Sequence, residues 1–154
     1  MCSSFSLFRS HLDVAHRYWE RLLTFGDLVI DATCGNGHDT LALAQLVIND
    51  NRGQVLAYDL QQKALDSAQD LLCKNLSKKQ IDRIHFIRSC HTLLPKKSEF
   101  FPVKCIVYNL GYLPGSDKSM TTKVSTSLES IRKALDLVCE GGAVSITCYP
   151  GHPE

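Results

Sequence analysis

An acid, two glycines and a histidine are crowded into residues 31–40, DATCGNGHDT, directly after an apolar run. Gly35 and Gly37 let the backbone turn sharply and approach a ligand closely, because glycine tolerates positive φ and has no side chain in the way. Asp59 follows 22 residues after Gly37, at the end of the next apolar run, where a carboxylate can accept hydrogen bonds from both hydroxyls of a ribose. The spacing therefore predicts a site for a nucleoside-containing cofactor.

Two cofactors, NAD and S-adenosylmethionine, fit the glycines and the acid that follows them. The dinucleotide fingerprint G-x-G-x-x-G/A needs a small third residue, where this chain has Thr40. Asp31, four residues before the first glycine, can meet a cationic aminoacyl group directly or through water, whereas an acid is unfavourable beside a pyrophosphate. The pattern favours S-adenosylmethionine, and a nicotinamide-dependent oxidoreductase is the alternative.

A second polar cluster, NLGYLP at residues 109–114, ends another apolar run. The side-chain oxygen of Asn109 and a neighbouring main-chain oxygen can accept two hydrogen bonds from one amino group. The ring of Tyr112 can lie against the face of a base. A tight turn made by Gly111 and Pro114 is the alternative interpretation. Next to a methyl donor, the cluster predicts methylation of an amine on a base, with Asn109 and Tyr112 as the catalytic residues.

Short apolar runs alternate with amphipathic segments along the chain, which predicts strands separated by helices. The expected strands are residues 28–33, 54–60, 84–89, 105–110 and 143–149, and the expected helices are 12–23, 40–47, 63–76 and 127–139. Strands that are apolar on both faces predict a mostly parallel, doubly wound α/β sheet covered on both sides, of the Rossmann-like class. The polar clusters follow the strands, so they should meet at the carboxyl edge of the sheet, where ligands bind in such folds.

The last expected helix has recognisable ends. Thr126 and Glu129 have the spacing of a capping box, in which the two side chains satisfy the first free backbone N–H groups. Gly141 and Gly142 are expected to end this helix.

The composition fits one compact domain, 1–154, in a soluble protein. The 154 residues carry a formal net charge of only +1, so contact with a nucleic acid must be local. The chain has no apolar run long enough to cross a membrane and no signal-peptide pattern, and we therefore expect a cytoplasmic protein. The seven cysteines lack a C-x-x-C pair, which predicts reduced thiols. A metal site built from Cys34, Cys90, His91 and His152 lacks paired ligand spacing, so no metal is expected.

With both clusters in view, the sequence resembles a class I S-adenosylmethionine-dependent methyltransferase. In particular, it is similar to the family known as putative rRNA methylases, whose members methylate the aminomethyl group of 5-aminomethyl-2-thiouridine at the wobble position of tRNA. The blocks that carry the resemblance are DATCGNGHDT (31–40), YDLQ (58–61), Cys90-His91, NLGYLPGSDKSMTT (109–122) and YPGHPE (149–154). The block at 109–122 is the most specific of them.

The resemblance implies roles for individual residues. The residues that it implies as cofactor contacts are Asn36, His38, Asp59, Gln61 and His91. The expected cofactor contacts also include Asp31, Gly35, Gly37 and Cys90. The expected substrate contacts, beside Asn109 and Tyr112, are Leu110, Gly111, Lys118 and His152, of which the lysine suits a phosphate group. His91 has a surface or capping role as its alternative. The implied cofactor is S-adenosylmethionine, and the implied partner is the anticodon loop of a tRNA.

The family pattern ordinarily continues beyond Glu154 with two more strands and a helix. We therefore expect a C-terminally short domain that lacks the usual last strand pair. An uncovered edge strand can pair with another chain, so a homodimer is one expectation. A module that binds S-adenosylmethionine or RNA with little or no activity is the alternative to an active enzyme.

Overall fold

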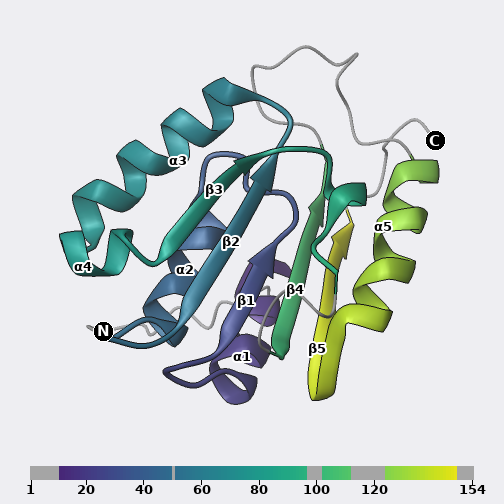
Figure 1. Cartoon of the computed structure of the whole chain (residues 1–154), viewed down its shortest axis with the longest axis horizontal. Helices are drawn as coiled ribbons and strands as arrows, with labels where there is room; N and C mark the ends of the chain where they lie inside the picture. Colours follow the sequence, from purple (N-terminus) through teal and green to yellow (C-terminus); the bar gives the residue numbers. More distant parts are fainter. Residues whose placement is uncertain (1–10, 50, 97–101, 112–123, 149–154) are drawn as a thin grey trace, which may run out of the picture.

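The computed structural model describes residues 11–49, 51–96, 102–111 and 124–148. Five strands form one sheet in the order β3-β2-β1-β4-β5, and every neighbouring pair is parallel (Figure 1). Their bounds are β1 Leu28–Asp31, β2 Gln54–Asp59, β3 Ile84–Arg88, β4 Val103–Leu110 and β5 Val138–Cys148. The strand order reverses between β1 and β4, which confirms the Rossmann-like, doubly wound class. No further strand occurs within the described ranges.

Helices cover both faces of the sheet. They are α1 His11–Leu22, α2 His38–Val47, α3 Gln62–Asn75, α4 Lys78–Ile81 and α5 Val124–Leu137, with a short 3₁₀ helix, η1 His91–Leu93. The first three helices pack against one face, and α5 and η1 pack against the other. Both layers can be followed in Figure 1. None of the helices in the described part of the chain is long and apolar enough to cross a membrane.

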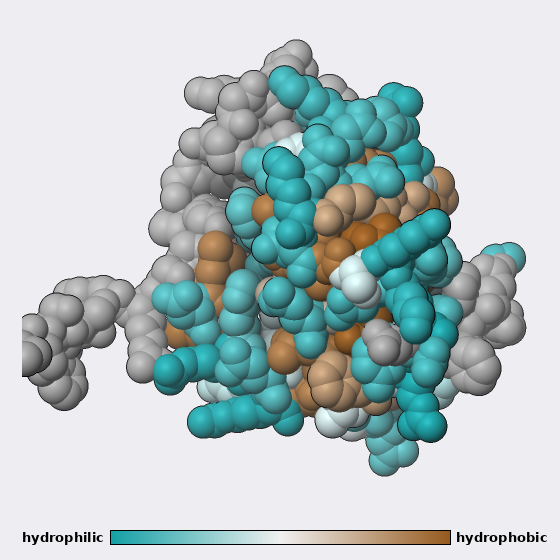
Figure 2. All heavy atoms as spheres, turned by 90° about the vertical axis from the view of Figure 1, so that its left-hand side faces the viewer, coloured by the Kyte–Doolittle hydropathy of each residue, from teal (hydrophilic) through white to brown (hydrophobic). Residues whose placement is uncertain are grey.

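The core divides into two layers because successive side chains of a strand point to opposite faces. On β1, Val29 packs with Trp19 and Leu43 on the side of α1 and α2. Its neighbour Ile30 packs on the other side, with Ala134 of α5. All four residues of β1 are buried, as expected for the central strand of a sheet that is covered on both faces. Figure 2 views the molecule from the side of α3 and α4, where hydrophilic side chains surround smaller apolar patches.

The predicted start of α5 was wrong. The helix begins at Val124, so Thr126 and Glu129 lie inside it and form no capping box at its start. Glu129 instead accepts a hydrogen bond from Lys133, one turn further along the helix, at 2.8 Å. A capping box does occur at α4, where Ser77 and Gln80 exchange hydrogen bonds between side chain and backbone.

The predicted end of α5 was also wrong, because the chain enters β5 directly after Leu137. Val138 pairs with Val103, but the next pair joins Ala143 to Cys105, so residues 139–142 form an irregular excursion within the strand. Gly141 has φ 71° there, and its carbonyl oxygen accepts a hydrogen bond from Lys104 at 2.8 Å. The two glycines that were expected to end a helix therefore belong to a strand.

Gly37 packs the glycine loop against α3. It precedes α2 with φ 87°, and a Cβ atom built on it would lie 2.7 Å from Cβ and 2.8 Å from Cα of Ala68. A side chain at this position would therefore clash with α3 in addition to straining the backbone.

We predict that Gly37→Ala lowers the free energy of unfolding by about 2–4 kcal/mol, from a left-handed backbone cost and an overpacking cost together. Gly26→Ala is the matched control, because Gly26 has φ 107° but a Cβ there would lie 3.9 Å from its nearest neighbour, Arg52. It should show the backbone cost alone. Urea denaturation of both variants measures the difference, and equal losses would contradict the clash with Ala68.

Candidate functional site

The ends of β1 and β4 lie side by side at the point where the strand order reverses. The backbone N–H of Asn109 donates a hydrogen bond to Oγ1 of Thr33 at 2.7 Å. Asn109 belongs to β4, whereas Thr33 opens the glycine loop after β1. The first cluster that the sequence singles out, 31–40, thus meets the described part of the second, 109–111, at one edge of the sheet. This edge is where open α/β sheets bind their ligands.

Asp59 connects the end of β2 to the glycine loop. One carboxylate oxygen accepts a hydrogen bond from the N–H of Gly35 and the other from the N–H of Gln61, both at 2.9 Å. Because a carboxylate has about four lone-pair sites, two remain for a ligand. Asp59 therefore fixes the loop and still has acceptors for hydroxyl groups.

Asp31 lies beneath the loop and is only 1% exposed. Its oxygens accept hydrogen bonds from the hydroxyl of Thr40 at 2.6 Å and from the N–H of Thr33 at 3.1 Å. Burial raises the pKa of Asp31 from 3.8 to about 7, and the nearby charge of Asp39 adds to the rise, although the hydrogen bond from Thr40 opposes it. Asp31 holds the loop in shape, and the contact with the cofactor that was expected of it stays a prediction.

Asp39 is a third carboxylate at this edge, in the first turn of α2. One of its oxygens accepts a hydrogen bond from the side-chain amide of Asn109 at 3.1 Å, and the other is 2.8 Å from Nε2 of His16. Asp39, His16 and Thr33 are not among the site residues predicted from the sequence. The signal for Asp39 was its place inside the block at 31–40, but nothing in the periodicity of α1 identified His16.

The acidic side chains at this edge indicate which of the two candidate cofactors, S-adenosylmethionine or NAD, the site suits. Asp31, Asp39 and Asp59 approach it from three elements, and the segments 31–37, 59–61, 89–91 and 109–111 contain no lysine or arginine. Such a set of side chains suits a cationic ligand and is unfavourable for a pyrophosphate. The residues present therefore fit S-adenosylmethionine, which carries a sulfonium and an ammonium group, better than they fit NAD.

His91 is buried on the face of the sheet that α5 covers, with 7% of its surface exposed. Its ring meets that of Tyr108 edge to face, with centroids 6.1 Å apart. Ser130 of α5 donates a hydrogen bond to the carbonyl oxygen of His91 at 2.6 Å and lies 2.7 Å from the hydroxyl of Tyr108. Since a serine hydroxyl has one proton, Tyr108 is the donor to Ser130.

The imidazole of His91 has a free nitrogen. Nε2 is buried and has no hydrogen-bond partner among the described residues. Burial lowers the pKa of His91, and the charge of Asp59 offsets part of this effect, so the ring is neutral near pH 7. A buried, unpartnered ring nitrogen costs free energy unless a ligand or water meets it. This observation favours the predicted ligand contact over the surface role.

The other predicted site residues are distributed as follows. Asn36, Gln61, Cys90, Leu110 and Gly111 are half-buried at the same edge, and His38 is exposed. Tyr112, Lys118 and His152 lie outside the described residues. Their roles stay predictions.

The cysteines of the described ranges are all free, and Cys34 and Cys105 are buried. Burial raises the pKa of the Cys34 thiol far above its usual range and that of Cys105 to about 12. Both are therefore neutral thiols that pack as small apolar groups. Within the described ranges, no three histidine, cysteine or acidic side chains gather as a metal site would need.

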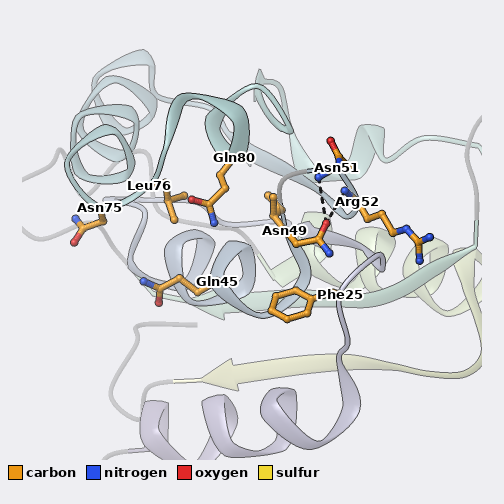
Figure 3. Close-up of a pocket in the computed structure, with 9 residues that line it drawn as sticks. Phe25, Gln45, Asn49, Asn51, Arg52, Asn75, Leu76 and Gln80 are labelled. Atoms are coloured by element: carbon orange, nitrogen blue, oxygen red, sulfur yellow. Dashed lines mark hydrogen bonds between the residues drawn. The ribbon is translucent and has the colours of Figure 1, made fainter.

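A separate hollow of about 600 Å³ lies at the opposite edge of the sheet, lined by residues such as Phe25, Asn49 and Gln80 (Figure 3). The oxygen of Asn49 accepts hydrogen bonds from the N–H groups of Asn51 and Arg52 at 3.2 and 2.9 Å. Gln80 belongs to the cap of α4. Because these amides are engaged in local turns, we regard the edge at Asp59 and Asn109, and not this hollow, as the candidate functional site.

The strand order, the glycine loop after β1 and the acid that ends β2 define a class I methyltransferase fold. The family described as Putative rRNA methylase matches residues 55–154. The chain belongs to this family.

Relatives agree with this assignment. A protein of Arabidopsis thaliana, tRNA (mnm(5)s(2)U34)-methyltransferase, chloroplastic, is 39% identical over 148 residues, which are 92% of this chain and 53% of that protein. The chain thus spans about half the length of this curated relative. The crystal structure of a putative rRNA-methylase from Clostridium thermocellum has a TM-score of 0.84 and 35% identity, covering 95% of this chain and 75% of that one. A putative methyltransferase from Streptococcus mutans in complex with SAH has a TM-score of 0.77 and 28% identity, covering 93% and 74%.

We predict that Asp31 makes stability depend on pH. Its pKa is raised in the folded state, so its contribution is fully present below about pH 4 and is lost as the pH rises through about 7. Relative to Asp31→Asn, which cannot ionise, the wild-type chain should lose up to about 4 kcal/mol of unfolding free energy between pH 4 and pH 8. Urea denaturation at several pH values measures this difference. Exposed Asp70 supplies the control variant Asp70→Asn, and equal pH slopes in wild type and Asp31→Asn would contradict the prediction.

Proposed function

We propose that the chain binds S-adenosylmethionine at the carboxyl ends of β1, β2 and β4 and transfers its methyl group to an amine of a tRNA nucleoside. The observation that carries this proposal is the hydrogen bond between Asn109 and Thr33, at 2.7 Å, because it holds the expected amine-binding residue next to the glycine loop. The proposed acceptor is the aminomethyl group of the modified wobble uridine. The name of the Arabidopsis relative supports this choice, and the SAH bound to the Streptococcus mutans relative supports the cofactor.

The cofactor would be held by the groups around the loop. Asp59 would accept hydrogen bonds from the ribose hydroxyls through the lone pairs that Gly35 and Gln61 leave free. His91 would direct its unpartnered Nε2 towards the cofactor or the substrate. The carboxylate of Asp31 would stabilise the positive charge of the ligand. Asn36, His38 and Cys90 are proposed to complete this site.

The reaction needs alignment more than acid–base strength. S-adenosylmethionine supplies a methyl group on a sulfonium, and the carbon–sulfur electrons return to sulfur when the amine lone pair forms the new bond. A free alkylamine has a pKa of about 10 and is mostly protonated in water. Burial beside a positive charge lowers that pKa and favours the neutral amine. The oxygen of Asn109 and a neighbouring main-chain oxygen would then orient it, with Tyr112 against the base.

The proposed partner is the anticodon loop of a tRNA. It would bind over the same edge, with Leu110, Gly111, Lys118 and His152 as contacts.

The sequence predicts that the protein is in the cytoplasm, whereas the name of the Arabidopsis relative places that protein in the chloroplast. Microscopy of a tagged chain decides between the two locations. A homodimer through the edge of β5 stays a prediction, to be tested by analytical ultracentrifugation.

A second candidate is a binding module with little or no turnover. The chain should be incubated with labelled S-adenosylmethionine and tRNA that lacks the final wobble methyl group, followed by mass spectrometry of the nucleosides. Labelled wobble uridine supports the enzyme. Calorimetric binding of SAH without any labelled nucleoside supports the module.

We predict that Asn109→Ala lowers methyl transfer at least about 100-fold, because the amine loses the acceptor that orients it. The affinity for SAH, measured by calorimetry, should stay within about threefold of wild type. Asn75→Ala is the control, since Asn75 is an exposed residue at the end of α3. Turnover of Asn109→Ala within about threefold of wild type would disprove the role of Asn109.

We predict that Asp59→Ala weakens SAH binding about tenfold or more, because it removes acceptors for the ribose and releases the N–H of Gly35. Asp66→Ala, at an exposed position of α3, should bind SAH like the wild-type chain. Calorimetry compares the two variants. Unchanged affinity in Asp59→Ala would place the ribose elsewhere.

A further inference from the structure

The side chain of Asn109 is part of a chain of hydrogen bonds that crosses three elements. Its amide nitrogen donates to one oxygen of Asp39 at 3.1 Å. The other oxygen of Asp39 lies 2.8 Å from Nε2 of His16. These residues come from β4, α2 and α1, so the hydrogen bonds link the two helices to the proposed reaction centre.

The partner of the amide decides which way it faces. An asparagine can present either its oxygen or its NH₂ group in a given direction by turning half a revolution about its last torsion. An ionised carboxylate only accepts hydrogen bonds, so Asp39 selects the NH₂ group. The oxygen of Asn109 then points away from Asp39 and is available to accept a hydrogen bond from an amine.

The surroundings of Asp39 strengthen this selection. Its side chain is 11% exposed and that of His16 is 33% exposed, so the hydrogen bonds lie where competition from water is reduced. The backbone of Asn109 is fixed separately by Thr33. Because the backbone of Asn109 is held in this way, the hydrogen bond to Asp39 restricts the motion that remains, which is rotation of the Asn109 side chain.

His16 is itself held in position. Its ring lies 4.7 Å, centroid to centroid, from the ring of Trp19 in the same helix. Nε1 of Trp19 donates a hydrogen bond to Oγ of Ser145 on β5 at 3.0 Å. The helix α1 is thereby fixed to the sheet with His16 directed at Asp39.

We propose that Asp39 is a positioning residue that sets the orientation of the Asn109 amide, and that His16 positions Asp39. This inference rests on the proposed function, since the orientation matters only if the oxygen of Asn109 receives the amine. It adds a requirement that neither the glycine loop nor the block at 109–114 contains: α1 must be docked for the amide to be set.

The rate test uses Asp39→Ala in the full chain with tRNA lacking the wobble methyl group. We expect kcat to fall about 10- to 100-fold, while KM for tRNA and Kd for SAH stay within about threefold. Asp70→Ala, on the exposed face of α3, is the matched control and should leave kcat unchanged. The double variant Asp39→Ala/Asn109→Ala should be no slower than Asn109→Ala alone, because both changes remove the same arrangement.

A second measurement observes the amide without any turnover. The side-chain NH₂ signals of Asn109 in a ¹⁵N NMR spectrum can be identified by their loss in Asn109→Ala. We expect these signals to shift in Asp39→Ala and their exchange with water to accelerate about tenfold or more. His16→Ala should produce a smaller change in the same signals, and His85→Ala, at an exposed position of β3, should produce none.

The outcomes separate this inference from the proposed function. If Asn109→Ala is inactive but Asp39→Ala keeps both wild-type kcat and wild-type amide signals, the positioning role is wrong and the function stands. If Asp39→Ala slows the reaction equally in the presence and absence of the Asn109 side chain, Asp39 serves the fold and the positioning role is also wrong. If Asn109→Ala keeps its activity, the proposed function of Asn109 fails, and the positioning role with it.

Discussion

The hydrogen bond between the N–H of Asn109 and the hydroxyl of Thr33, 2.7 Å long, is the contact on which the site depends. It lies where the strand order reverses, between β1 and β4. On either side of a reversal the connections leave towards opposite faces, so no helix covers the carboxyl ends of the two central strands. Thr33 bridges these ends and holds the glycine loop against Asn109. Two further carboxylates join this pair, since Asp59 accepts a hydrogen bond from Gly35 of the loop and Asp39 accepts one from the side chain of Asn109.

Three carboxylates at one edge of the sheet repel one another, which destabilises the fold unless other interactions offset the repulsion. Asp31 has a raised pKa and accepts hydrogen bonds from Thr40 and Thr33. Asp59 accepts hydrogen bonds from two backbone N–H groups, and Asp39 forms hydrogen bonds with Asn109 and His16. A cation bound here would relieve the mutual repulsion of these groups. The acidity of this edge therefore favours a positively charged ligand.

The sequence predicted the strands and the edge at which the site lies, because buried parallel strands are apolar throughout and polar clusters interrupt them only at their ends. It failed at α5 and β5. Thr126 and Glu129 match a capping pattern, but the helix begins at Val124, before both of them. Gly141 lies in an irregular part of β5, where its carbonyl oxygen accepts a hydrogen bond from Lys104, and periodicity does not reveal such a contact. His16 was missed for a related reason: its partner Asp39 is distant in sequence, and only the crossing of α1 over α2 brings them together.

The close packing of Gly37 against Ala68, with no room for even a methyl group between them, has a consequence for how a ligand is accommodated. The glycine loop cannot move towards α3 unless α3 moves with it, and α3 is anchored in the core through Leu65 and Leu72. The wall formed by the loop is therefore unyielding on this side. A ligand that meets the loop would have to conform to its shape, because the loop cannot make room by shifting into α3.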